Sequence, residues 1–418
     1  MRSVSRVDRE TGDLRYRGYM LALSGVTAAL AVAAPSMAMP VLFAEIAEDL
    51  CLSLVQVGAI WGTVAFAGLF AGLAGGMIGD RFGPMRTLAA ACFLLGLAGA
   101  SRGLSNDLVT MATTVFLAGL LAAAIPMNLH KVCAIWFSGK RLGSANAVIS
   151  AGMALGFMIG SMISATVLSP WLGGWRHVLF LYGGTGVLIS IPWAFARRAP
   201  REKTGLARGG STPSFRRSLA HVARLRSVWV LGVALLGVGG GVQGLLGYLS
   251  LYLRGIEWSA ASADASLAGF HAISLLAVFP LALLSDRIGS RRKLLVAATL
   301  TTACGIGLLS IVDGVVIWIA VLAAGAVRDG YMAVFMTTVT ELRGVGVEYA
   351  GTAIGLAMTL SRVGGLVAPP LGNSLAAYDP RAPFVLWAAM ALLGLAALGL
   401  LGRNGAQAEP AAAWSMDA

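Results

Sequence analysis

The chain has 418 residues, of which 57% are hydrophobic and 12% are charged, and its mean hydropathy is +0.80. A soluble domain of this composition would lack the polar surface needed to face water, so we expect the solvent to be a lipid bilayer. The net charge of +12 is consistent with a nucleic-acid partner, but the basic residues stand in short segments beside apolar runs. That arrangement is typical of loops retained on the cytoplasmic side, and no nucleic-acid partner is expected.

Twelve apolar runs are long enough to cross the membrane, which takes about 20 helical residues for about 30 Å of hydrocarbon. The predicted spans are residues 18–44, 54–79, 84–105, 108–137, 143–169, 176–196, 228–253, 263–284, 294–312, 315–339, 349–375 and 382–402. The longest polar stretch lies between the sixth and seventh spans. The sequence therefore predicts an all-α integral membrane protein with an N-terminal six-helix bundle (1–200), a cytoplasmic central loop (201–226) and a C-terminal six-helix bundle (227–418).

Lysine and arginine are distributed unequally between the two sets of loops. The termini and the loops on their side hold 24 of the 31 basic residues, whereas the opposite loops hold four. Because basic loops resist translocation, both termini are predicted to be cytoplasmic in a multi-pass protein of the cell (inner) membrane. The other three basic residues, Lys131, Arg328 and Arg362, lie inside predicted spans.

The chain repeats itself over about half its length. Residues 76–86 recur as residues 282–292, with Asp80 matching Asp286 at an offset of 206, and Gly143-Ser144-Ala145 recurs as Gly351-Thr352-Ala353 at an offset of 208. Two pairs at nearly one offset indicate two homologous halves, an organisation typical of transporters.

The repeated segment resembles the signature of the major facilitator superfamily, G-x-x-x-D-R-x-G-R-[RK], which stands between helices two and three and, in degraded form, between helices eight and nine. The first copy keeps Gly76, Asp80, Arg81, Gly83 and Arg86 but has Pro84 at a basic position. The second copy keeps Asp286, Arg287, Gly289, Arg291 and Arg292 but has Ala282 for the leading glycine.

This resemblance implies two pseudo-symmetric six-helix bundles and secondary active transport of a small solute by alternating access. It also implies that the motif residues form a conformational latch, in which Gly76 lets helix two approach helix eleven and Asp80 meets the positive end of that helix. The alternative is that Arg81 and Arg86 only anchor the topology. The stretches 128–137 and 362–370 look most like bacterial members annotated for cyanate, nitrate and other small anions.

Four charged side chains are placed inside predicted spans, where one charge costs roughly 2.5–3.5 kcal/mol on insertion scales. Arg328 and Asp329 are central in the tenth span, Arg362 is central in the eleventh, and Lys131 lies toward the cytoplasmic end of the fourth. Three bases against one acid favour a small organic or inorganic anion, and the planar guanidinium suits an oxyanion. The competing interpretation is structural: Asp329 pairs with Arg362, because neighbours on a helix point about 100° apart, and Lys131 snorkels to the surface.

Two neutral residues complete the candidate site, Gln243 in the seventh span and His271 in the eighth. His271 is a candidate for carrying a coupling proton in a symport, with Asp329 as an ion-pair or coupling residue; the alternative for His271 is a hydrogen bond to a carbonyl. The fifth span has glycine at every fourth position from Gly152 to Gly160, a pattern that permits tight helix contact.

Other functions find little support in the sequence. It has no metal-ligand spacing, disulfide framework or nucleophile motif, so no enzyme, cofactor or metal is expected, and the protein is expected to act as a monomer. Gly239–Gly244 matches a dinucleotide pattern but lies inside an apolar run without a preceding strand. The main rival function is proton-driven efflux of lipophilic or cationic compounds.

The predicted topology places a cysteine introduced at Ser211 in the cytoplasm. In a Ser211→Cys variant, a membrane-impermeant maleimide is expected to label position 211 only after permeabilisation, because the basic central loop is not translocated. Cys51, in a predicted outward loop, is the positive control, and peptide mapping assigns the label. Labelling of position 211 in intact cells would contradict the topology.

Overall fold

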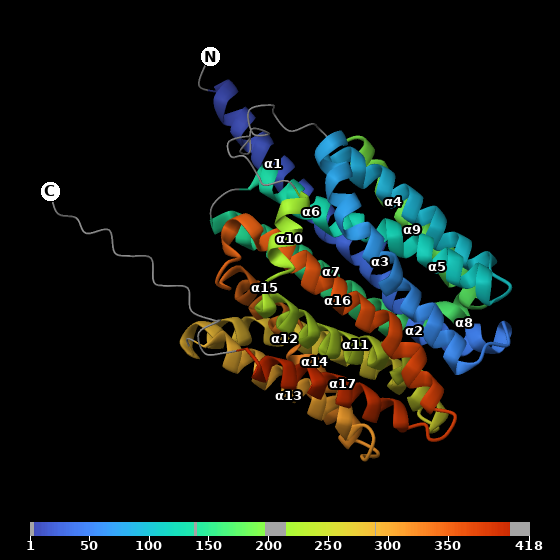
Figure 1. Ribbon diagram of the computed structural model, residues 1–418. Coiled ribbons are helices and arrows are strands. Elements are labelled where there is room, and N and C mark those ends of the chain that lie inside the picture. The colour runs from blue at the N-terminus through green and yellow to red at the C-terminus, as the bar shows by residue number, and fades with distance from the viewer. Residues whose placement is uncertain (1–3, 138–139, 197–214, 289, 402–418) are drawn as a thin grey trace. The chain divides into compact units, whose positions relative to one another are not determined.

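The computed structural model describes residues 4–137, 140–196, 215–288 and 290–401, and this part of the chain is built from helices without any strand (Figure 1). Eleven helices in it are long and apolar enough to cross a membrane. The ninth predicted span coincides with a further helix, α13, whose first three residues are basic. The all-α, multi-pass fold class is therefore confirmed.

The chain divides into two compact units, which are described separately. Unit 1 comprises Met1–Gly209 with Leu246–Leu275, and unit 2 comprises Gly210–Leu245 with Leu276–Ala418. Two helices, α11 (Arg226–Gly255) and α12 (Ala260–Ile288), contribute to both. The division into two six-helix bundles stays a prediction.

The other elements follow the predicted spans in order. Unit 1 holds α1 (Val4–Val26), η1 (Thr27–Ala33), α2 (Ala34–Asp49), α3 (Leu54–Phe82), α4 (Pro84–Ser101), η2 (Arg102–Leu104), α5 (Leu108–Ala122), α6 (Ala124–Trp136), α7 (Lys140–Ile163), η3 (Ser164–Leu168), α8 (Ser169–Leu172) and α9 (Trp175–Ala194). Unit 2 holds α10 (Phe215–Val222), α13 (Arg291–Leu308), α14 (Val316–Ala326), α15 (Arg328–Thr340), α16 (Gly346–Leu375) and α17 (Ala382–Gly399). The first span was predicted to end at residue 44, whereas its helix continues to Asp49.

Unit 1 is held together by the glycines of α7. A Cβ atom on Gly152, Gly156 or Gly160 would lie 2.5, 2.3 or 2.3 Å from the carbonyl oxygens of Gly25, Ala29 or Ala34. The backbones of the fifth and first spans are therefore in direct contact, and the tight contact predicted from the glycine spacing is confirmed. At this contact the first span adopts the π-helical turns of η1.

Glycines also set the packing of α11 in unit 2. The indole of Trp387 on α17 occupies the space that side chains at Gly244 and Gly372 would need, with Cβ distances of 2.3 and 2.4 Å to its ring. Gly239–Gly244 lies within the unbroken helix α11, so these glycines serve helix contacts and form no phosphate-binding turn.

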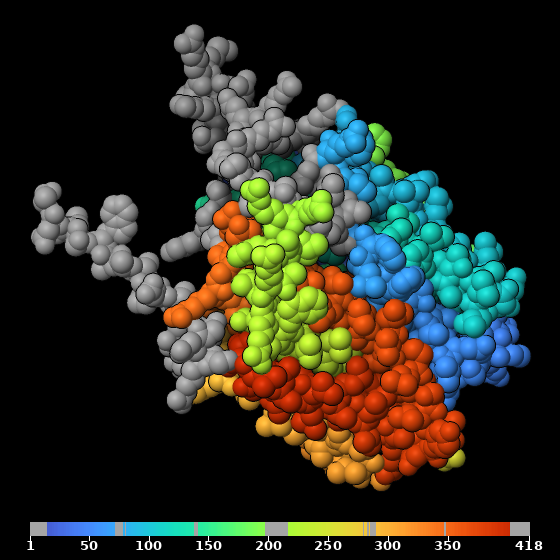
Figure 2. All heavy atoms as spheres, viewed as in Figure 1, coloured from blue at the N-terminus to red at the C-terminus, as the bar shows by residue number. Residues whose placement is uncertain are grey.

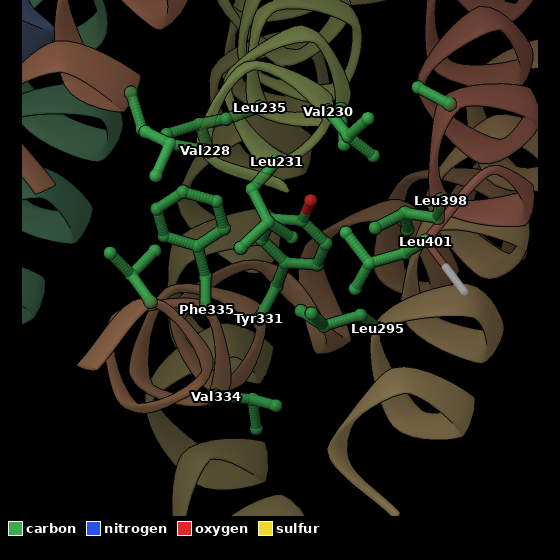
Figure 3. Packing of buried hydrophobic residues seen from close by; sticks show 14 of the residues in the cluster. Val228, Val230, Leu231, Leu235, Leu295, Tyr331, Val334, Phe335, Leu398 and Leu401 are labelled. Atoms are coloured by element: carbon green, nitrogen blue, oxygen red, sulfur yellow. The ribbon is translucent and has the colours of Figure 1, made fainter. Parts of the chain in front are cut away.

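The apolar core of unit 2 gathers residues from α10, α11, α13, α15, α16 and α17, and Figure 3 shows part of it. Tyr331 and Phe335 of α15 stack with ring centroids 6.2 Å apart, and Leu231 and Leu235 of α11 belong to the same buried cluster. Leu295 of α13 and Leu398 of α17 complete it (Figure 3). Residues from spans seven, nine, ten and twelve thus pack into one core.

Two spans are interrupted at matching points of the repeat. The fourth span breaks at Ala123, between α5 and α6, and the tenth breaks at Val327, between α14 and α15. These positions are 204 residues apart (327 minus 123), close to the offset of the sequence repeat. The internal repeat therefore extends to the irregularities of the backbone.

We expect the substitution Gly156→Ala to destabilise unit 1, because its Cβ would fall 2.3 Å from a backbone oxygen that no rotamer change can move away. Overpacking of this kind costs about 1–3 kcal/mol. The measurement is thermal unfolding of the purified variant in detergent. The control is Gly184→Ala on α9, where a Cβ meets nothing within 4 Å; equal melting temperatures for the two variants would contradict the packing argument.

Candidate functional site

The break in the tenth span places two predicted site residues at the start of a helix. Val327 has φ −98° and ψ −7°, and Arg328 and Asp329 are the first residues of α15. The Asp329 carboxylate lies in the first turn, where the helix dipole favours negative charge. Arg328 Nη1 donates to Asp329 Oδ1 at 3.0 Å, with 29% and 37% of the two side chains exposed.

The predicted pairing of Asp329 with Arg362 is therefore wrong. The 100° separation of neighbours on a helix applies to the directions of the Cβ atoms. An arginine side chain is long enough to bend back to the adjacent carboxylate, so the directions of the Cβ atoms do not prevent the contact.

Arg362 lies at the middle of α16 and is exposed. Among the residues that the structure describes, its guanidinium has no hydrogen-bond or ion-pair partner. Because an unpaired charge facing hydrocarbon is costly, an exposed arginine at this depth is expected to face a water-filled space.

Gln243 is half-buried in α11, three residues after Gly240. There α11 and α16 are in close contact: a Cβ on Gly239 would lie 2.5 Å from Ser361 Oγ, and one on Gly240 would lie 3.0 Å from Gly364 O. Gln243 and Arg362 are thus each within one helical turn of the same contact in unit 2. No motif in the sequence predicted that Gln243 and Arg362 lie near this contact.

Lys131 and His271 belong to unit 1. Lys131 is half-buried on α6, the segment after the break in the fourth span, and the neighbouring His130 Nδ1 is 3.0 Å from Asn146 Oδ1. His271 on α12 is 1% exposed, and its ring centroid is 5.0 Å from that of Phe157 on α7. The ring of His271 therefore packs against Phe157 of α7 and against its own neighbour Phe270.

A buried charge cluster, which sequence reasoning missed, lies in unit 1. Asp264 of α12 is fully buried and accepts hydrogen bonds from Ser250 Oγ at 2.7 Å and Arg254 Nη2 at 2.8 Å. Glu45 of α2 lies within electrostatic range of Asp264 and accepts a hydrogen bond from Ser169 Oγ at 2.5 Å. The sequence signal was present but discounted: Asp264 stands at the start of the eighth predicted span, and Glu45 directly follows the first.

The structure describes only part of the predicted latch. Gly76 and Asp80 are in α3, and Asp286 and Arg287 are in α12, but their side chains, like Gly289 as a whole, lie outside the described part. Arg81 and Arg86 are exposed, and Gly83 has φ +88° between α3 and α4, a conformation that glycine allows.

In the second copy of the motif, Arg291 holds the end of the tenth span. Its Nε lies 2.6 Å from Glu341 Oε2 and its Nη2 2.7 Å from Glu341 Oε1, a two-point contact of the kind that guanidinium favours. The motif thus ties the start of α13 to the C-terminal end of α15 within unit 2. Among the described residues, no group of three His, Cys, Asp or Glu side chains is placed to hold a metal.

Comparison with known proteins places these features in a family. The family model described as Major Facilitator Superfamily matches residues 21–369. The chain is similar to two solved structures: a bacterial homologue of the human lysosomal transporter Spinster, with 14% identity, a TM-score of 0.77 and coverage of 94% of this chain and 99% of that one, and the nucleoside transporter NupG, with 10% identity, a TM-score of 0.77 and coverage of 91% and 99%.

Curated relatives match at low identity. The probable galactarate/D-glucarate transporter GudP of Escherichia coli (strain K12) is 26% identical over 39% of this chain and 37% of its own length. The gentisate transporter of Corynebacterium glutamicum is 22% identical over 85% of this chain and 81% of its own length. The match with GudP thus spans little more than a third of that protein.

We expect Arg328 and Asp329 to be energetically coupled to each other, and Asp329 and Arg362 to be independent. A double-mutant cycle of melting temperatures on Arg328→Ala, Asp329→Ala and the double variant should give a coupling of about 0.2–1 kcal/mol, the range for partly exposed pairs. The matched cycle on Asp329→Ala and Arg362→Ala should give none. Coupling found only in the second cycle would overturn the observed pairing.

Proposed function

The chain belongs to the major facilitator superfamily, and we propose that this transporter moves a small hydroxylated carboxylate across the inner membrane by alternating access, with Arg328, Arg362 and Lys131 on the substrate path. In this proposal Gln243 and His271 contact the substrate, Asp329 and His271 take part in proton coupling, and the repeated motif is the latch. The two repeats supply the two six-helix halves.

The observation that carries the proposal is Arg362. It is a mid-helix guanidinium, exposed and without a partner among the described residues, so its positive charge is available to a ligand. Arg328 pairs with Asp329, and both side chains stay about a third exposed. A planar guanidinium binds carboxylate with two parallel hydrogen bonds, which a lysine cannot provide.

The named substrates of the relatives support the same class. Galactarate, D-glucarate, gentisate and L-galactonate, after which the relatives are named, all carry a carboxylate next to hydroxyl groups. Within unit 2, a guanidinium for the carboxylate and an amide for the hydroxyls would match Arg362 with Gln243. Small inorganic anions lack the hydroxyls and would leave that amide unused.

The test is a thermal-shift screen of the purified protein with galactarate, galactonate and gentisate, and with tetraphenylphosphonium as a lipophilic cation. A ligand at 100 times its dissociation constant stabilises by about 2.7 kcal/mol, which is readily measured. A shift with at least one carboxylate is expected. A shift with tetraphenylphosphonium alone would favour the efflux alternative.

The variants Arg362→Lys and Arg328→Lys then separate charge from geometry. Each variant keeps its positive charge and loses the planar guanidinium. If the guanidinium binds the substrate, the apparent affinity for the carboxylate, measured from the thermal shift, should fall at least tenfold. The matched control is Arg381→Lys, in a predicted outward loop, whose parent guanidinium pairs with Asp313. Parent-like affinity in well-folded Arg362→Lys and Arg328→Lys proteins would remove both residues from the site.

A further inference from the structure

Four arginines surround the short helix α10 and the turn that joins it to α11, and all four are exposed. They are Arg216, Arg217, Arg224 and Arg226. None has a hydrogen-bond or ion-pair partner among the described residues, in contrast to Arg291, Arg328 and Arg381 of the same unit, which pair with carboxylates. Four uncompensated guanidinium groups within eleven residues form a strongly positive surface.

The position of this surface is fixed by contacts on the other side of α10. His221 Nε2 lies 2.8 Å from Gly344 O, and its ring stacks on Tyr349 of α16 with centroids 4.4 Å apart. Ser218 and Val222 are buried. The helix is therefore docked on the start of α16 by one face, and Figure 2 shows the yellow-green α10 lying uncovered beside the orange α16.

The apolar and aromatic residues nearby indicate where this surface stands relative to the bilayer. Trp229, in the first turn of the membrane-spanning α11, is 42% exposed, and its indole Nε1 donates to Ala223 O at 2.8 Å. Leu219 is 37% exposed on α10 itself. Tryptophan is enriched at the level of the lipid headgroups, so we expect the four arginines, which stand within 13 positions of Trp229 in the sequence (229 minus 216), at that level as well.

We propose that Arg216, Arg217, Arg224 and Arg226, with Trp229, form a binding surface for the headgroups of anionic phospholipids. A phosphodiester supplies the oxyanion that the four guanidinium groups lack, and the exposed Leu219 and Trp229 contact the acyl boundary. Charge alone keeps a basic loop in the cytoplasm, but it does not require the loop to be folded and docked on α16. This surface is independent of the substrate site.

The test measures binding of fluorescently labelled phosphatidylglycerol to the purified full chain in neutral detergent, with labelled phosphatidylcholine for comparison and no transport substrate present. Phosphatidylglycerol should bind more tightly, and binding should weaken as salt is raised. Each arginine removed should weaken it roughly fivefold, which corresponds to about 1 kcal/mol per basic residue at a membrane surface. Equal affinity for the two lipids would overturn the proposal.

The decisive variant changes all four arginines to glutamine, and its matched control changes four other exposed basic residues on the same predicted side, Arg15, Arg86, Arg141 and Lys293. Both lose four charges, so general attraction predicts equal losses, whereas a built surface predicts a loss confined to the first variant. Equal losses would refute the site.

Two further measurements keep the test decisive. If the fourfold variant is not monodisperse, the double variant Arg216→Gln with Arg217→Gln replaces it. Its affinity for phosphatidylglycerol should fall by less than that expected for the fourfold variant. An affinity equal to that of the parent would contradict the proposal. Competition with inorganic phosphate at the same concentration separates the two sources of oxyanion. Failure to displace the lipid supports a headgroup site, whereas full displacement would show a site for free phosphate.

Discussion

Direct contact between helix backbones at glycine is the constraint on which both units depend. In lipid the hydrophobic effect does not drive helices together, so helix association relies on close packing and hydrogen bonding. In unit 1, Gly156 and Gly160 bring α7 onto the first span, and Gly183 brings α9 onto α4, where its Cβ would lie 2.6 Å from Gly96 O. In unit 2, Gly244 and Gly372 accommodate Trp387. A side chain larger than hydrogen at these points would separate the helices and move every group they position.

The tight packing explains how the chain holds charge within its spans. Asp264 is fully buried because Arg254 and Ser250 supply both a counter-charge and hydrogen bonds, and Arg328 has Asp329 beside it. Removal of one partner from such a buried pair leaves an uncompensated charge, which is costly. Arg362 differs from Arg328 in the described part of unit 2: it is central in its helix and exposed, and it has no partner there. This contrast between paired and unpaired cations is what distinguishes a structural charge from one available to a ligand.

Sequence reasoning predicted the features that depend on local pattern. Span length, the repeated motif and the glycine spacing from Gly152 to Gly160 each reflect the physics of one helix or of a pair of helices. Sequence reasoning failed to predict the partners of charged side chains, because these depend on contacts between distant segments or on the conformation of one side chain. Glu45 and Asp264 are 219 positions apart (264 minus 45), and nothing in either local pattern indicates the other. The contact between Arg328 and Asp329 depends on the reach of the arginine side chain, which the periodicity of Cβ directions does not describe. The functional role of the site residues stays a prediction.

The matching helix breaks show how one repeated backbone acquired two chemistries. At the offset of 204 residues that relates Ala123 to Val327, Arg328 and Asp329 correspond to Ala124 and Ile125. The same offset relates Lys131 of α6 to Phe335 of α15, which is fully buried and stacks on Tyr331. Each half therefore retains the break but carries charge at a different distance after it: directly after the break in α15, and about two turns later in α6. Both break residues keep right-handed helical backbone angles, so each break is a single-residue turn between two helices of one span. The repeat thus supplies two equivalent places for polar residues, and the divergence of their side chains makes the distribution of positive charge unequal between the two halves.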